Sequence, residues 1–189
     1  IRRAHRLNPD AVISVAGCYA QRAPQELLAI PGVRLVLGTK NRSKIVELVE
    51  KVHHENIQLD AVENIMITRE FEDLAIEAQE GHTRAFLKIQ EGCNQFCSYC
   101  IIPYARGPIR SRKRKDIVDE VKRLAEAGFK EIVLTGIHIA SYGKDTHEGT
   151  LLDVIQDIYP IPGIERIRLG SIEPTLLQPS FAQAVADME

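Results

Sequence analysis

The sequence predicts an α/β fold in two parts, an N-terminal parallel α/β part of flavodoxin-like or Rossmann-like type followed by a partial (β/α) barrel. Two observations support this prediction. Short apolar segments of strand length alternate with longer amphipathic segments of helix length along the 189-residue chain. Several of the apolar segments also end at glycine, which is typical of the loops that follow parallel strands.

In the first part, strand and helix patterns alternate twice. We predict strands at residues 11–16 and 33–37, a helix at 24–30 with Pro24 in its first turn, and an amphipathic helix at 41–52. Parallel sheets of this kind bind ligands beyond the carboxyl ends of their strands. Cys18 follows the first strand at such an end, although a single cysteine after an apolar run is more often a small core residue.

Residues 55–84 are predicted to be a linker between a first domain at 1–54 and a second at 85–189. The stretch is acidic and its apolar pieces are short, although Ile65-Met66-Ile67 could form an extended strand. His53, His54 and His82 lie in or beside this polar segment. We expect them to be solvated side chains rather than metal ligands.

The second part contains three strand-helix units. We predict strands at 85–90, 131–135 and 164–169, a helix at 116–127 with Asp116 as its N-cap and Gly128 as its stop, and a helix from the cap Thr150 to Tyr159. Successive βα units of this kind build a barrel whose chemistry lies at the carboxyl ends of its strands. The loops that follow the three strands should therefore share one rim.

The loop after the strand at 85–90 contains Cys93, Cys97 and Cys100. This spacing can place three thiolates at three corners of one iron-sulfur cube and leave the fourth iron without a protein ligand. Zinc sites usually draw four ligands from separate pairs, and the only other cysteine is Cys18. Three clustered cysteines and a distant one also fit no disulfide framework. We therefore predict a 4Fe-4S cluster with an open iron.

The net charge of -2 conceals a strong local asymmetry. Residues 55–80 hold eight acidic and one basic residue, a balance of -7, whereas residues 81–115 hold eight basic and one acidic, a balance of +7. The basic residues after the cysteine loop are suited to nucleic-acid phosphates, unless some of them pair with the acidic segment. The predicted phosphate contacts are Arg110, Arg112, Lys113, Arg114 and Lys115.

Composition also sets limits on the function. The chain is 44% hydrophobic and 26% charged, which is ordinary for a globular protein. No apolar run approaches the roughly 18 residues that a membrane span needs, so we expect no membrane partner. The chain begins at Ile1 without a methionine, and we interpret it as a fragment of a longer protein.

In combination, four motifs resemble the methylthiotransferase family of radical S-adenosylmethionine (SAM) enzymes, which insert a methylthio group into tRNA or a ribosomal protein. The likeness covers essentially the whole chain. The motifs are Gly17-Cys18-Tyr19-Ala20-Gln21, the cysteine loop with Ile101–Gly107 and Ser111-Arg112, Leu134–His138 with Tyr142-Gly143, and Ser171-Ile172-Glu173-Pro174.

The resemblance implies a site and a mechanism. A cluster on the catalytic residues Cys93, Cys97 and Cys100 would cleave SAM to a 5'-deoxyadenosyl radical, and an electron donor would reduce that cluster. Tyr99, Gly136, Ser171 and Glu173 would bind SAM, unless Glu173 instead caps the helix that follows it. Cys18 would ligate a second 4Fe-4S cluster, whose other ligands lie outside this sequence.

The resemblance also implies a substrate and a location. The segments at 104–107 and 168–174 are most similar to the bacterial branch that modifies threonylcarbamoyladenosine at position 37, in the anticodon loop of tRNA. Sister branches modify isopentenyladenosine-37 or ribosomal protein S12, and a non-catalytic iron-sulfur or zinc module that binds RNA is a further alternative. We expect a cytoplasmic protein.

Overall fold

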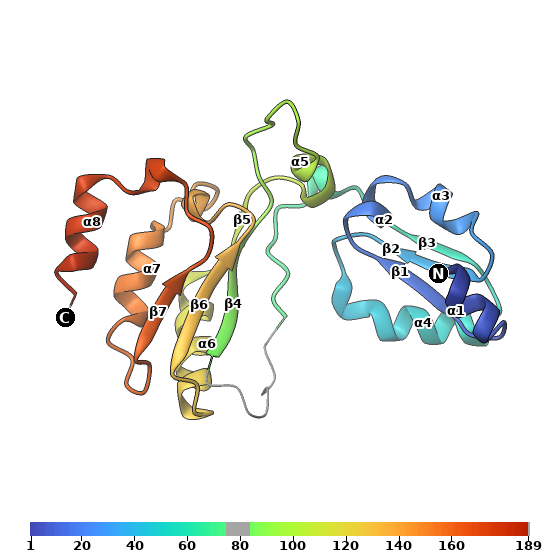
Figure 1. The fold of residues 1–189 in the computed structure, drawn as a ribbon, viewed down its shortest axis with the longest axis horizontal. Coiled ribbons are helices and arrows are strands. Elements are labelled where there is room, and N and C mark those ends of the chain that lie inside the picture. The colour runs from blue at the N-terminus through green and yellow to red at the C-terminus, as the bar shows by residue number, and fades with distance from the viewer. Residues whose placement is uncertain (75–83, 189) are drawn as a thin grey trace. The chain divides into compact units, whose positions relative to one another are not determined.

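The computed structural model describes residues 1–74 and 84–188 and forms two compact units (Figure 1). The first unit consists of Ile1–Thr68 and Gln95–Pro108, and the second of Arg69–Asn94 and Ile109–Glu189. Both units are mixed α/β structures built on parallel strands, which confirms the predicted fold class. One of the three boundaries between the units falls inside the cysteine loop, between Asn94 and Gln95.

The first unit contains a three-stranded parallel sheet in the order β1-β2-β3. Strand β2 is central, which explains why four of its five residues are buried. The strands are β1 (Ile13–Ala16), β2 (Val33–Leu37) and β3 (Leu59–Ala61), and the helices are α1 (Arg2–Leu7), α2 (Cys18–Arg22), α3 (Pro24–Leu28), α4 (Ile45–His54) and α5 (Ile102–Arg106), with 3-10 turns η1 (Arg42–Lys44) and η2 (Ile65–Ile67).

Two features of the first unit differ from the sequence-based expectations. Strand β3 lies within the segment 55–84 for which we predict a linker, and it pairs with β2. The apolar run Ile65-Met66-Ile67 forms the 3-10 turn η2 and not the extended strand that was considered as an alternative there. The side chain of Asn64 accepts a hydrogen bond from the backbone N–H of Met66, which favours this turn over an extended chain. His53 and His54 are exposed as expected, and His82 lies outside the described residues.

The second unit contains a four-stranded sheet in the order β5-β4-β6-β7 (Figure 1). Strands β4, β6 and β7 are parallel and each leads towards a helix, which confirms the predicted partial barrel. The short strand β5 pairs antiparallel with the end of β4. The elements are β4 (Arg84–Glu91), β5 (Arg110–Ser111), α6 (Arg114–Glu126), β6 (Glu131–Gly136), η3 (Ile139–Ser141), α7 (Leu151–Ile158), β7 (Arg166–Leu169), η4 (Pro174–Leu176) and α8 (Pro179–Ala186).

The core of the second unit lies between the sheet and helices α6 and α7. Alternate residues of β4 point into it, because side chains alternate between the two faces of a strand. The buried residues of this core include Ala85, Leu87 and Ile89 from β4, Ile117, Val121 and Leu124 from α6, Ile132 and Leu134 from β6, and Val154 and Ile158 from α7. This packing fixes β4 and β6, whose carboxyl ends carry the candidate site.

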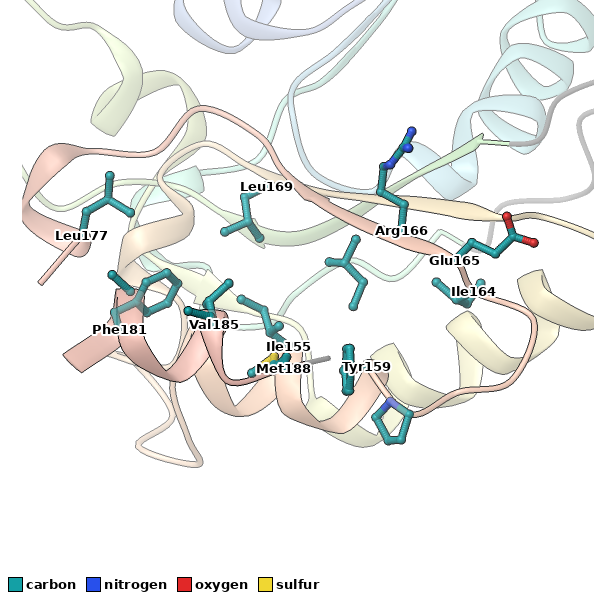
Figure 2. A pocket seen from close by; sticks show the side chains of 14 residues that line it. Ile155, Tyr159, Ile164, Glu165, Arg166, Leu169, Leu177, Phe181, Val185 and Met188 are labelled. Carbon is teal, nitrogen blue, oxygen red and sulfur yellow. The ribbon is translucent and has the colours of Figure 1, made fainter. Parts of the chain in front are cut away.

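A second apolar surface of this unit lies between β7 and the two C-terminal helices. The side chains of Ile155 and Tyr159 from α7, Leu169 from β7, and Phe181 and Val185 from α8 surround a pocket of about 930 Å³ (Figure 2). None of the predicted site residues lines this pocket. Cys93, Gly136, Ser171 and Glu173 lie instead at or just after the carboxyl ends of the strands.

The helix ends show local sequence control. Helix α6 begins at Arg114, and its N-cap is Lys113. The prediction that Asp116 is the N-cap is therefore wrong, because Asp116 lies in the first turn of the helix. At that position the negative charge of Asp116 interacts favourably with the positive end of the helix dipole. Gly128 ends this helix with a φ of +91°, and Thr150 caps α7 in a reciprocal pair with Asp153, both as predicted. None of the helices in residues 1–74 and 84–188 is long and apolar enough to cross a membrane.

Candidate functional site

The parallel strands of the second unit bring several predicted site residues to one edge. Cys93 follows β4, Gly136 ends β6, and Ser171 and Glu173 follow β7. Because the carboxyl ends of parallel strands meet at the same edge of a sheet, these four residues lie along one rim. Cys93 is nearly buried, with 9% of its surface exposed, whereas Gly136, Ser171 and Glu173 are exposed.

Gln90 links two loops of this rim and was not predicted as a site residue. Its side chain is fully buried at the end of β4. The amide Nε2 donates to the carbonyls of Glu91 and Gly92 at 2.9 and 2.7 Å, and Oε1 accepts from the backbone N–H of His138 at 2.7 Å. Gln90 therefore ties the backbone before Cys93 to the loop after β6. The available signal was an amide at the end of the apolar and basic strand predicted at 85–90.

Gly136 makes room for this buried amide. A Cβ atom at Gly136 would lie 2.9 Å from Cβ of Gln90 and 2.8 Å from Cγ2 of Ile139. Real Cβ contacts are not this short, so any larger residue would displace Gln90 or η3. The structure thus gives Gly136 a packing role at the rim, in addition to the SAM contact that the resemblance implies.

Glu173 faces His138 across the same rim. Its Oε1 lies 2.6 Å from Nε2 of His138, and Nδ1 of the same ring lies 2.6 Å from Oγ of Ser141. The Glu173 side chain is 47% exposed, so it is accessible to a ligand as well. Glu173 precedes the turn η4 but its side chain makes no capping hydrogen bond there, so the capping alternative is not observed. The sequence-based site did not include His138.

The other two cysteines of the loop belong to the first unit. The backbone N–H of Cys100 donates to the carbonyl of Cys97 at 2.9 Å, which forms a tight turn between the two thiols. Cys97 is exposed and Cys100 is half-buried. Tyr99 is 91% exposed, so its ring is accessible to a bound molecule. All four cysteines are free thiols.

The loop fits an iron-sulfur cluster by donor chemistry. Its three free thiols are the ligand type that iron-sulfur clusters use, and the loop has positive φ angles at Gly92 (+74°) and Phe96 (+48°). Within residues 1–74 and 84–188, no three Cys, His, Asp or Glu side chains are gathered as ligands of one metal ion.

Cys18 has a polar environment in the first unit. It is the first residue of α2, after Gly17, whose φ of +114° is a backbone conformation that only glycine adopts easily. The Cys18 sulfur accepts a hydrogen bond from Nε of Arg106 at 3.0 Å. The thiol is half-buried and is not part of the apolar core of this unit. This environment does not match that of a small core residue.

Two of the five predicted phosphate contacts, Arg110 and Arg112, are buried, which corrects that prediction. Arg110 and Arg112 are 3% and 5% exposed, and Arg112 pairs with Asp73 and Glu120. Arg114 pairs with Asp157 at 2.7 Å. Direct phosphate contact by Arg110 and Arg112 is therefore wrong, whereas Lys113 and Lys115 are exposed.

Two of the motifs that carry the resemblance are joined in the structure. The Tyr142 hydroxyl donates to the carbonyl of Arg112 at 2.6 Å, and the backbone N–H of Gly143 donates to Oγ of Ser111 at 2.8 Å. Burial raises the pKa of Tyr142 to about 12, so this hydroxyl keeps its proton at neutral pH. The Ser111-Arg112 and Tyr142-Gly143 motifs are thus held together by two hydrogen bonds.

Sequence comparisons define the class to which this fold and rim belong. The family model "Radical SAM superfamily" matches residues 87–176, which include the cysteine loop, β6 and the 171–174 loop. Two relatives named threonylcarbamoyladenosine tRNA methylthiotransferase MtaB, from Bacillus subtilis and Aquifex aeolicus, are 47% and 41% identical over 92% and 91% of the chain. A Clostridium beijerinckii tRNA-2-methylthio-N(6)-dimethylallyladenosine synthase is 35% identical over 100% of the chain.

The chain is a member of the radical SAM methylthiotransferase family. It spans 39% of the length of the Bacillus subtilis relative and 42% of each of the other two.

Proposed function

We propose that the complete protein inserts a methylthio group at carbon 2 of threonylcarbamoyladenosine-37 in tRNA by radical SAM chemistry. The observation that carries this proposal is the cysteine loop, which leaves β4 at the carboxyl rim of a partial barrel within the region that matches the radical SAM model. The similarity to two relatives whose names state this reaction supports the choice of substrate.

Cys93, Cys97 and Cys100 would hold the catalytic 4Fe-4S cluster. When bound, the cluster would supply the electron that cleaves the carbon-sulfur bond of SAM. Gln90 would hold the backbone before Cys93 in place through its bond to the Gly92 carbonyl. The exposed ring of Tyr99 would lie against the adenine of SAM.

The carboxylate of Glu173 would bind SAM at the same rim. Its position against His138 limits its rotation and leaves it partly accessible. A carboxylate held in this way can accept a hydrogen bond from the ammonium or the ribose of SAM. Gly136 and Ser171, which end or follow the neighbouring strands, would allow the ligand to approach the backbone closely.

The test of the chemistry is SAM cleavage by the anaerobically reconstituted complete protein. After chemical reduction, the wild type should produce 5'-deoxyadenosine, and the Cys97→Ala variant should produce none above background. Ser98→Ala is the matched control, because Ser98 lies in the same loop and is exposed but is not a proposed ligand. A non-catalytic iron-sulfur module would bind iron and RNA without releasing 5'-deoxyadenosine.

The test of the substrate is mass spectrometry of tRNA nucleosides from cells that lack the gene. We expect loss of 2-methylthio-threonylcarbamoyladenosine and its return on complementation. An unpaired anticodon-loop base is a reasonable target, since it reaches an active site without the melting of a duplex. Loss of only the dimethylallyl (isopentenyl) analogue would favour the activity that names the Clostridium beijerinckii relative, and loss of a methylthio group from ribosomal protein S12 would favour a protein substrate.

A further inference from the structure

Helix α5, which follows the cysteine loop, packs against α2, which begins at Cys18. Both helices belong to the first unit. Ala105 of α5 is fully buried, and its carbonyl accepts a hydrogen bond from Oγ1 of Thr39 at 2.8 Å. Gly107 ends the helix with a φ of +72° and donates its N–H to the carbonyl of Pro103. Helix α5 therefore has a defined position on the N-terminal sheet.

Arg106 is the last residue of α5, and its guanidinium reaches Cys18. The Nε–H group donates to the Cys18 sulfur, with 3.0 Å between the heavy atoms. The two residues are 88 positions apart in sequence, so this contact depends on the packing of α5 against α2. Arginine suits such a contact because its planar guanidinium stays charged and directs its N–H groups rigidly.

We propose that Arg106 is a positioning residue for Cys18 as a ligand of the second cluster. This inference depends on the proposed function, in which Cys18 binds that cluster in the complete protein. The hydrogen bond would hold the sulfur in place, and it would also remove electron density from it. Hydrogen bonds to ligand sulfurs and nearby positive charge favour the reduced state of an iron-sulfur cluster, so Arg106 would raise its reduction potential.

Arg22 provides a matched control on the same pair of helices. It lies at the end of α2, and its guanidinium is stacked over the ring of Tyr104 in α5, 5.5 Å from the ring centre. Replacement of Arg22 removes the same charge from the same unit and weakens a contact between the same two helices. It leaves the hydrogen bond between Arg106 and Cys18 in place.

The experiment uses the complete protein with Cys93, Cys97 and Cys100 all replaced by Ala, so that only the second cluster contributes iron. Iron and sulfide are counted, and the reduction potential is measured by redox titration with electron paramagnetic resonance. In this background, Arg106→Gln should lose iron or shift the potential to a more negative value. Arg106→Lys keeps the charge and should have a smaller effect, and Arg22→Gln should match the parent in both measurements.

The outcomes separate this inference from the proposed function. A parent that binds about four iron atoms, with Arg106→Gln unchanged in iron content, potential and spectrum, overturns the role of Arg106 alone. A parent that binds no iron overturns the second cluster and the role of Arg106 together. Equal effects of Arg106→Gln and Arg22→Gln would also overturn it, because they would show a general effect of charge or helix packing.

Discussion

The guanidinium of Arg112 and the carboxylate of Asp73 form an ion pair within the second unit, with 2.8 Å between Nη2 and Oδ1. The Arg112 side chain is only 5% exposed and also lies 3.3 Å from Oε2 of the buried Glu120. Arg112 therefore balances negative charge inside the protein. A run of basic residues in sequence does not by itself give a positive surface.

We expect Arg112→Met to lower the free energy of unfolding by about 3 kcal/mol, because it leaves Glu120 buried with less compensating charge. Urea denaturation measures the loss. The double variant Arg112→Met/Glu120→Gln should regain part of it, since the buried negative charge is also removed. Lys113→Met, at an exposed neighbouring position, should stay within about 0.5 kcal/mol of the wild type. Equal effects of the two single changes would contradict a structural role for Arg112.

Lys113 and Lys115 are the two predicted phosphate contacts that are exposed. Reversal of both charges in the complete protein should weaken tRNA binding and reduce the logarithmic salt dependence by roughly 0.7 to 0.9 for each phosphate that is no longer bound. Filter binding at several salt concentrations checks this. Lys122→Glu, on the exposed surface of α6, serves as the control for a change in net charge. If the double variant and the Lys122→Glu control show the same salt dependence of tRNA binding, these two lysines make no specific phosphate contact.

Asp153 makes the stability of α7 dependent on pH. Hydrogen bonds from the hydroxyl and the backbone N–H of Thr150 hold the pKa of Asp153 below its ordinary value of 3.8. A carboxyl with a lowered pKa contributes stability above its ordinary pKa, and this contribution is lost as the pH falls through the folded-state pKa. We expect Asp153→Asn to cost about 1 kcal/mol near neutral pH.

The cost of Asp153→Asn should shrink as the pH falls below the ordinary carboxyl pKa of 3.8 and through the lower pKa of the folded state, because the wild-type carboxyl then gains a proton. Denaturation curves over this range measure the difference between the two proteins. Asp119→Asn is the control, because Asp119 is exposed on α6 and lies outside any capping position. A cost for Asp153→Asn that is independent of pH would contradict the charged capping interaction.

The long, strongly patterned elements were predictable from sequence. The apolar face of α6 and the Thr150 cap of α7 are local signals, and the structure confirms both helices. The five-residue helices α2 and α5 were not predicted, because a helix of little more than one turn shows no periodicity. Strand β3 has three residues and depends on pairing with β2, which no local pattern reveals.

The candidate site was predictable only in part, for a similar reason. Cysteine spacing is a local property and singled out the loop. The contacts of Gln90 with His138 and of Arg106 with Cys18 join residues 48 and 88 positions apart, and they arise only when strands and helices pack. Burial of Arg110 and Arg112 likewise follows from tertiary structure, since arginine is mostly exposed in proteins.

Gln90 offers a test of how the rim is held. Gln90→Met keeps a similar volume but removes the partners of the Gly92 carbonyl and the His138 N–H. Loss of these buried hydrogen bonds should cost about 1–3 kcal/mol of unfolding free energy. The iron content of the reconstituted complete protein should fall as well. Gln95→Met, at an exposed position in the loop, should change neither quantity. Full stability and iron content in Gln90→Met would show that the rim does not depend on this amide.

Glu173 provides the sharpest test of SAM binding at this rim. Its carboxylate lies against His138 and is partly exposed, so Glu173→Gln removes the charge with little change in shape. Loss of one charge-assisted hydrogen bond should weaken SAM binding by roughly ten- to a hundredfold. Isothermal titration of the reconstituted complete protein with SAM measures this. Glu165→Gln is the matched control, because Glu165 is exposed just before the opposite end of β7 and pairs with Lys130. If Glu173→Gln binds SAM as tightly as the wild type does, the Glu173 carboxylate does not contact SAM, and its role is limited to the contact with His138.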